Sequence, residues 1–406
     1  MRGTLGLKRK EDCMTSRDRV VTTLSRKEPD KIPIDCGGTI CSTMTRTAHN
    51  AVKAHLGIKT PDEPITHPVL DTVVPCDQLL KRFHVDFRTI RMKPPSNIGA
   101  DSADRQGFSA TSAAAIIQPR GHTFSDEFGT VWQKADYDYA PVKYAFADFT
   151  VSDLNKFKWP DPYDPGRVQG LRQEARHLCE TTDLAIVGDI MCGGPFEQAL
   201  WLRGYTQFLT DMYADPKFVV ALLDKITELD IGFWDAYLGA IGDYVQVVAQ
   251  GDDLGMQIQE YISPELYKKY IFPCHKRMFS FIKSKTKAKI FLHSCGCVRD
   301  FIPFFIEEGI DALNPVQSGA VRMDIAELKR TFGRELSFWG GGFDVQHKLG
   351  DETSVKEIKE IVKRNIEVLA PGGGFVFAAT HNIQHEAPPE KTLAIYDTAV
   401  ANQNYH

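Results

Sequence analysis

Residues 288–317 read AKIFLHSCGCVRDFIPFFIEEGIDALNPVQ, and this stretch decides the expected fold. The apolar run 290–292 has the length of a buried strand. It is followed over 298–308 by apolar residues that recur at three- and four-residue steps, which predicts a helix. Gly309 ends that helix, and a second short strand is expected over 311–313. The stretch is therefore a strand–helix–strand unit, and in parallel folds of this kind ligands bind where strands give way to loops.

His293 and Cys295 stand at that point of the first strand. They are two residues apart, so on an extended backbone their side chains point to the same side. An imidazole beside a thiolate is half of a zinc site. An H-x-C spacing is a weak motif by itself. The alternative is therefore that His293 and Cys295 are buried structural residues without a chemical role.

The composition excludes several classes of protein. The chain has 406 residues and a net charge of −5. Of its residues, 43% are hydrophobic and 25% are charged, and both fractions are ordinary for a globular protein. Its Lys and Arg residues form no basic field that would indicate nucleic acid. No apolar run approaches the ~18 residues of a membrane span, and the N-terminus has no apolar segment of a secretory signal. Nine cysteines without a disulfide-like spacing fit a reducing cytoplasm.

The order of predicted elements indicates one large domain. Residues 1–13 are expected to be a disordered leader, and 14–406 a single domain that begins with a helix capped by Thr15 or Ser16. A first strand is expected over 32–36 and a second over 83–88. Strands and helices alternate about eight times, which predicts an α/β fold with one parallel sheet, and we expect a closed (β/α)8 barrel of the TIM type. No dinucleotide fingerprint or phosphate loop is present.

An aromatic-rich excursion from about 92 to 151 interrupts this alternation. It is rich in Pro, Gly, Ser and Asp, and we expect a small hairpin in it around 126–130 with Gly129 in the turn. Two roles remain open for its aromatic residues, which either cover a pocket or cap the bottom of the fold. These residues are Phe124, Phe128, Trp132, Tyr137, Tyr139, Tyr144 and Phe146.

Polar residues at the expected strand ends form the candidate site. His381 follows the last strand and, with His293 and Cys295, could close three sides of a tetrahedron. Three protein ligands with one open place describe a catalytic zinc, whereas His or Asp without metal would serve as acid–base groups. The other candidates are Asp252, Asp253 and Asp344 as catalytic groups and Asn314, Gln317, Gln346 and Asn382 as substrate-binding groups. Cys36, either Arg88 or Arg91, and Asp189 are further residues of the same rim.

From residue 14 onward the chain resembles the uroporphyrinogen decarboxylase superfamily and, within it, the cobalamin-dependent methyltransferase branch. The motifs that carry the resemblance are GDDLG at 251–255, HSCG at 293–296, DALNPVQ at 311–317, the glycine-rich loop at 340–346, and APGGG at 370–374 leading into HNIQ at 381–384. Their order along the chain is specific for the superfamily and less specific for one activity within it.

The resemblance implies a (β/α)8 barrel and a zinc site. In zinc-bearing members an H-x-C pair and a later cysteine bind the metal, which places His293 and Cys295 in the pair and His381 where the cysteine stands. The family's carboxylate ligand falls near 314–317, where this chain has no acid. The fourth place is then substrate, water, or one of Asp252, Asp253 and Asp344.

The resemblance also implies the expected reaction, transfer of a methyl group from a methylated small molecule to the Co(I) of a separate corrinoid protein. An O-methyl ether is the expected donor, and the aromatic stretch 124–146 suggests an aromatic methyl ether. Three alternatives remain: the reverse transfer from methyl-corrinoid to a thiol or other acceptor, a uroporphyrinogen decarboxylase-like reaction, and a non-catalytic corrinoid- or tetrapyrrole-binding protein. The decarboxylase branch needs N-terminal arginines that 33–43 lack, although His381 takes the place of its active-site histidine. A homodimer is compatible with the sequence.

Overall fold

The computed structural model describes residues 14–67, 69–96, 117–120, 123–134, 139–346, 349 and 352–405, with the backbone alone for 117–120. The expected leader and part of the excursion lie outside these ranges. Within them, no helix is long and apolar enough to cross a bilayer.

Seven parallel strands form the central sheet, in the order β14-β13-β12-β11-β10-β9-β4. Neighbouring strands in this sheet are also consecutive in the sequence among the seven. Right-handed strand–helix–strand units produce this order. Their bounds are β4 Phe87–Ile90, β9 Ala185–Gly188, β10 Val247–Gly251, β11 Lys289–His293, β12 Ala312–Asn314, β13 Ser337–Trp339 and β14 Phe375–Val376.

The segment predicted as the first strand joins the two edges of this sheet. Ile34 forms parallel bridges to Val85, just before β4, and to Phe377, just after β14. The Asp35 N–H donates to the Phe377 carbonyl at 2.8 Å, and the Phe377 N–H donates to Pro33 at 2.9 Å. The sheet therefore closes into the predicted (β/α)8 barrel, with this segment in the eighth position.

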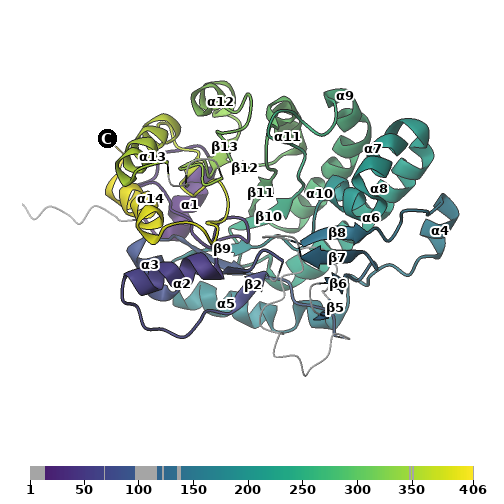
Figure 1. Cartoon of the computed structure of the whole chain (residues 1–406), viewed down its shortest axis with the longest axis horizontal. Helices are drawn as coiled ribbons and strands as arrows, with labels where there is room; N and C mark the ends of the chain where they lie inside the picture. Colours follow the sequence, from purple (N-terminus) through teal and green to yellow (C-terminus); the bar gives the residue numbers. More distant parts are fainter. Residues whose placement is uncertain are drawn as a thin grey trace, which may run out of the picture.

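Helices surround the barrel, as Figure 1 shows. The unit at 288–317 is confirmed, because β11 and β12 flank the helical segment made of η4 (Arg299–Phe301) and α11 (Ile302–Glu308). The other helices are α1 Ser16–Leu24, α2 Arg46–His55, α3 Asp77–Arg82, α4 Val151–Lys156, η2 Pro165–Val168, α5 Leu171–Thr181, α6 Pro195–Arg203, α7 Tyr205–Ala214, α8 Pro216–Ile241, α9 Pro264–Leu266, η3 Tyr267–Ile271, α10 Phe272–Lys285, α12 Ile325–Phe332, α13 Val355–Leu369 and α14 Pro389–Ala401.

The strand predicted over 83–88 was placed too early. Phe83 ends helix α3, and His84 has a φ of +51°, a left-handed conformation that stops the helix. Regular pairing begins only at Phe87. The apolar residues 83 and 85 misled the prediction, because both are buried, but Phe83 ends the helix and Val85 forms only an isolated bridge to Ile34.

Two smaller sheets lie outside the barrel. Strands β1 Met44–Thr45, β3 Thr72–Val73 and β2 Ile65–His67 form one of them. The excursion supplies the other, β5 Ile117–Arg120, β6 Thr123–Ser125, β7 Val131–Lys134 and β8 Tyr139–Lys143, which lies beside α6 in Figure 1. Strands β6 and β7 are the arms of the predicted hairpin, and Gly129 lies in its loop with a φ of +88°.

Candidate active site

A cavity of about 350 Å³ opens where the barrel strands end. Its lining includes groups that can bind a metal or a proton: Cys41, Glu197, Asp253, His293 and His381. It also includes aromatic residues: Phe124, Trp132, Tyr139, Trp201 and Tyr205. Several barrel strands and the excursion thus build one cavity together.

His293 is the last residue of β11, and its ring is held by the neighbouring strand. Its Nδ1 lies 2.6 Å from Oδ1 of Asn314, while the Asn314 amide donates to the Trp339 carbonyl at 3.0 Å. The amide orientation makes Nδ1 the protonated nitrogen of His293, since an acceptor faces it. The other nitrogen, Nε2, is then the one with a lone pair to offer to the site.

Cys295 lies next to that free nitrogen. Its Sγ is 3.2 Å from His293 Nε2, and its backbone N–H donates to Asp253 Oδ1 at 2.8 Å. The turn after Cys295 is fixed as well, because the Gly296 N–H donates to Gln317 Oε1 at 2.7 Å. The predicted H-x-C pair therefore converges on one point, together with the carboxylate of Asp253.

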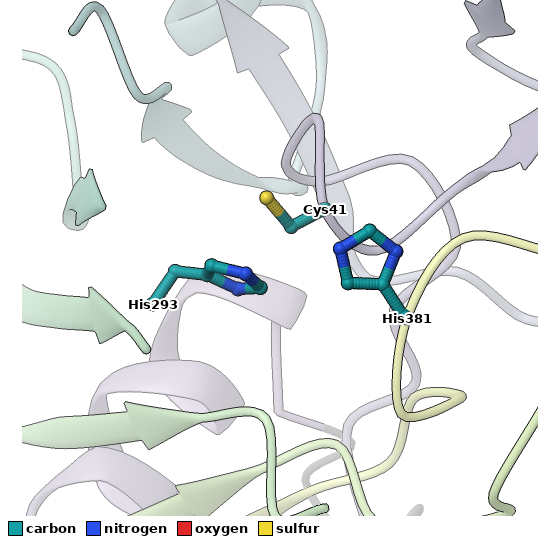
Figure 2. Close-up of side chains that lie close together, drawn as sticks. All are labelled: Cys41, His293 and His381. Carbon is teal, nitrogen blue, oxygen red and sulfur yellow. The ribbon is translucent and has the colours of Figure 1, made fainter. Parts of the chain in front are cut away.

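His381 lies across from His293, with 5.5 Å between the ring centroids. Figure 2 shows both rings together with Cys41, which comes from the loop that leaves the first barrel segment. Sequence analysis did not identify Cys41. It named Cys36 on the same segment, but Cys36 is fully buried and its pKa is raised to about 12 by burial.

The loop that carries Cys41 is fixed at both flanks. Asn382 accepts from the Thr43 N–H at 2.9 Å and donates to the Ile40 carbonyl at 2.8 Å. On the other flank, the Ile40 N–H donates to Asp189 at 3.1 Å, and Asp189 also accepts from Arg91 Nε at 2.9 Å. The end of the barrel thus holds the thiol in place through backbone contacts on either side of it.

Two groups of potential metal ligands share His293. Cys41, His293 and His381 form one, and Asp253, His293 and Cys295 the other; within each group the ligand atoms lie within 4.8 Å of one another. Ligands at about 2.0–2.3 Å from a zinc ion would be roughly 3–4 Å apart, so either group needs only small movements to close on a metal. The three predicted ligands are therefore near one another but divided between two groups.

Burial controls the protonation of these side chains. Burial and the nearby His293 lower the pKa of His381 to about 3, so its imidazole is neutral and available as a ligand at neutral pH. Burial, with the charges of surrounding acids, raises the pKa of the Cys41 and Cys295 thiols. A cation at this point would favour the thiolates, because it offsets the cost of burying their charge.

Asp252 and Asp253 are adjacent but face different surroundings. Asp253 lines the cavity, whereas Asp252 is fully buried and accepts from the backbone N–H groups of Phe196 and Glu197 at 3.2 and 2.7 Å. Its carboxylate also contacts His275 Nε2 at 2.7 Å. Asp252 therefore fixes the start of α6 and does not reach the cavity, contrary to its expected catalytic position.

Glu197 is another cavity residue that sequence analysis did not identify. It lies in the first turn of α6, and its carboxylate accepts from the Asp253 N–H. Burial and the charges of Asp253 and Asp252 raise its pKa well above the usual range, which favours the protonated form. Its one sequence signal is its place in the loop-to-helix junction after β9, a position shared by many residues without a role.

The four residues expected to bind substrate, Asn314, Gln317, Gln346 and Asn382, are not among the cavity-lining residues. Asp344, expected to be catalytic, does not line the cavity either. Gln317 donates to Gln346 Oε1 at 2.6 Å and to Gln257 Oε1 at 2.9 Å, so these amides bond to one another. Asp344 is buried and accepts from the Gln346 N–H at 3.1 Å. Their polar groups hold the loops of the rim in position.

Some aromatic residues of the excursion line the cavity, so the first of the two roles left open, covering a pocket, applies to them. Phe124 and Tyr139 have centroids 5.0 Å apart, and Trp132 packs edge-on against Trp201 of α6 at 5.5 Å. We call these four residues the aromatic wall. Trp132 is fixed by donation from its Nε1 to Asp126 at 2.9 Å. Phe128, Tyr144 and Phe146 do not line the cavity, and Tyr137 lies outside the described residues.

Comparison with known proteins identifies the family. The model of the uroporphyrinogen decarboxylase family matches residues 123–401, and the chain belongs to this family. It is 24% identical over 315 residues to a uroporphyrinogen decarboxylase of Citrifermentans bemidjiense. The aligned region covers 76% of this chain and 82% of the relative. It is 25% identical over 264 residues to a uroporphyrinogen decarboxylase of Actinobacillus pleuropneumoniae. Here the aligned region covers 61% of this chain and 68% of the relative.

A solved structure shares the whole fold. A methyltransferase from Methanosarcina mazei superposes with a TM-score of 0.62 over 96% of this chain and 98% of that one, at 16% sequence identity. At this identity the match supports the barrel architecture, and the activity must be argued from the site.

Proposed function

We propose that this chain is a zinc-dependent methyltransferase that moves a methyl group from an O-methylated small molecule to the Co(I) of a corrinoid protein. The observation that carries the proposal is that two imidazoles, two thiols and one carboxylate lie close together at a small cavity with aromatic residues in its lining. This donor set is the one that zinc prefers in proteins. The methyltransferase from Methanosarcina mazei shares the fold, so the barrel is compatible with this reaction class.

We assign the metal to His293 and His381, with one thiolate as the third ligand. The grouping of ligand atoms favours Cys41, and Cys295 is the thiolate expected from the sequence. Three protein ligands leave one coordination place open toward the cavity. When bound there, Zn²⁺ supplies Lewis acidity that offsets negative charge on the leaving oxygen.

The chain's own residues perform the other tasks. Asn314 fixes the His293 ring, and Asn382 with Asp189 fixes the Cys41 loop. Glu197 carries its proton at the cavity surface, where it can donate a hydrogen bond to the leaving oxygen. The methyl carbon passes to cobalt as the carbon–oxygen bond breaks, and the oxygen takes up one proton.

A separate corrinoid protein is the proposed second partner. A cavity of about 350 Å³ is at the lower end of the range for small-molecule sites, about 300–1,000 Å³, and therefore suits the methyl donor alone. We accordingly propose that cobalt approaches from the open side of the barrel. The cytoplasm is the proposed compartment, since a site with free Cys41 and Cys295 requires reduced thiols.

The reverse reaction uses the same site. In that direction a bound acceptor thiol would take the methyl group from methyl-corrinoid, and zinc would favour its thiolate form. The aromatic wall and Glu197 favour an oxygen substrate, since a thiol needs neither an aromatic surface nor a proton donor.

Decarboxylation of a tetrapyrrole is the second candidate, and the names of the relatives favour it. Such substrates carry several carboxylates. Of the described residues that line the cavity, none is Arg or Lys, so no guanidinium or ammonium is there to bind them.

Metal analysis and a methyl-transfer assay test the proposal. The purified protein should contain about one zinc per chain and should methylate added Co(I) corrinoid when given a methoxylated compound. His293→Ala should lose both the metal and turnover, whereas a non-catalytic corrinoid binder would keep its affinity. Release of CO₂ from a carboxylated porphyrinogen in the presence of a chelator would establish the decarboxylase instead.

A further inference from the structure

We infer that the protein has a second ligand site, outside the active-site cavity, that binds a small oxyanion at Arg88 and Arg91. Sequence analysis placed one of these two arginines at the rim of the active site, but neither lines the active-site cavity. The inference does not depend on the proposed function, because the residues that carry it are not assigned to the metal.

Both side chains line a separate cavity of about 670 Å³, which we call the arginine cavity. Its lining residues lie in the segments 60–66, 74–80 and 88–91, and its volume is in the range of small-molecule sites, about 300–1,000 Å³. Strand β2 stands between the two cavities: Thr66 lines the arginine cavity and His67 the active-site cavity, as the alternation of side chains on a strand requires. The two cavities therefore have different linings.

The guanidinium groups in the arginine cavity have more donors than partners. Each guanidinium carries five N–H donors. Arg88 donates from Nη1 to the Phe87 carbonyl at 3.0 Å and from Nη2 to Asp77 at 3.4 Å. Arg91 donates from Nε to Asp189 at 2.9 Å, and its buried Nη2 has no partner among the described residues. A buried donor without an acceptor costs free energy, which an oxyanion would offset.

A hydroxyl group adds to these donors. Thr60 is another lining residue, and its Oγ1 is buried without a hydrogen-bond partner among the described residues. A hydroxyl can donate to an oxyanion as readily as to water. Three lining residues of the arginine cavity thus offer donors that the described part of the chain leaves unused.

The positive charge in this cavity is only partly offset by carboxylates. Asp77, the partner of Arg88, is 78% exposed, so solvent screens that pair. Burial lowers the pKa of Arg88, and the nearby Asp77 raises it by less. Glu63 also lines the cavity, but its carboxylate lies with His49 and Cys76, with potential ligand atoms within 4.8 Å of one another. A bound anion would supply the missing negative charge.

The chemistry of the guanidinium group names the ligand class. It forms two parallel N–H···O bonds with a carboxylate or a phosphate group, which a neutral ligand or a cation cannot match. A phosphate has more oxygens than a carboxylate and can meet both guanidinium groups at once. We therefore expect the site to favour a phosphate group.

Titration calorimetry of the purified protein with inorganic phosphate and with acetate, at neutral pH and constant ionic strength, tests the inference. Phosphate should bind at least threefold more tightly than acetate. Tighter binding of acetate would retain the oxyanion site and assign it to carboxylates. No binding of either anion would overturn the inference.

Arg88→Gln should weaken phosphate binding at least fivefold, and it leaves Arg91 to hold Asp189. Asp77→Asn, at an exposed position, removes the competing carboxylate and should strengthen binding at least twofold. Arg172→Gln is the matched control, since its guanidinium pairs with Asp243 outside the arginine cavity, and it should leave binding unchanged.

The variants also locate the bound anion. Phosphate held by a metal in the active site would bind Arg88→Gln as tightly as the wild type, and that result would overturn the inference. An equal loss in Arg88→Gln and Arg172→Gln would overturn it as well, because it would show attraction by overall charge alone. The Asp77→Asn series stands even if Arg88→Gln does not fold, and unchanged or weaker binding there would contradict the site.

Discussion

His293 Nδ1 lies 2.6 Å from Asn314 Oδ1, and this contact determines which nitrogen the site can use. The two residues end neighbouring parallel strands, and His293 pairs with Asn314 in the register of β11 and β12. The Asn314 amide group donates to the Trp339 carbonyl on the next strand. Three adjacent strands thus orient one imidazole so that Nε2 faces Cys295 and the cavity.

Asn314→Ala should weaken zinc binding by about 10- to 100-fold, because it removes the acceptor that orients the His293 ring. Competition with a chromophoric chelator measures this affinity. Asn314→Asp is the control, since an oxygen remains opposite Nδ1, and its affinity should stay near that of the wild type. Wild-type zinc affinity in the alanine variant would show that the Asn314 contact does not serve the metal.

Cys41→Ser should lower zinc affinity at least tenfold and remove thiolate-to-metal charge-transfer absorption from the cobalt(II)-substituted protein. The reason is its grouping with His293 and His381. Cys295→Ser should have the smaller effect. Cys179→Ser on α5, away from the cavity, serves as control for loss of a thiol. The opposite order, with Cys295 essential and Cys41 dispensable, would assign the third ligand to Cys295.

Asn382→Ala should destabilise the metal-free protein by about 1–3 kcal/mol, because two buried backbone groups of the Cys41 loop lose their partner. Urea unfolding at neutral pH measures this change. Glu386→Ala, an exposed position in the same segment, should change stability by less than about 0.5 kcal/mol. Equal effects of the two substitutions would mean that the loop does not depend on Asn382.

The barrel could be predicted from sequence because its signals are local. An apolar run followed by a helical pattern, as at 288–317, recurs along the chain and forces parallel pairing. The second strand was predicted too early along the chain, because His84 ends α3 through a left-handed backbone conformation that no periodicity reveals. Closure through Ile34 depends on a single residue paired on both sides.

The candidate site was predictable where it lies on strand ends and not where it depends on loops. His293 and His381 were found because each comes at the end of an apolar run, 290–292 and 375–379, that predicts a strand. Cys41 was missed because its loop must bend back over the barrel, held by Asn382 from the other end of the chain. Asp252 and Asp253 could not be told apart, since neighbours on an extended segment point to opposite sides and only the register selects the one that faces the cavity.

The stability of the protein should fall as the pH rises from neutral toward 10, because of His275. Burial by itself would lower the pKa of this histidine, but Glu308 and Asp252 outweigh burial and raise it to about 10. Its Nε2 lies 2.7 Å from Asp252, and its Nδ1 lies 2.9 Å from the Tyr267 hydroxyl, which donates to Glu308. An unfolded histidine titrates near 6.5, so the stabilisation is complete below that pH and is lost as the pH rises through about 10.

His275→Gln tests this assignment, since it keeps hydrogen-bonding capacity and removes the charge. It should cost about 3–5 kcal/mol of unfolding free energy at pH 7, where it leaves the buried Asp252 and Glu308 without a cation. Urea unfolding of both proteins from pH 6 to pH 10 should show their difference shrinking as the wild-type imidazolium loses its proton. His177→Gln, on the helix α5, is the control and should follow the wild type. A difference that stays constant over this range would show that His275 is neutral in the folded protein, and Asp252 would then hold the start of α6 without a buried imidazolium beside it.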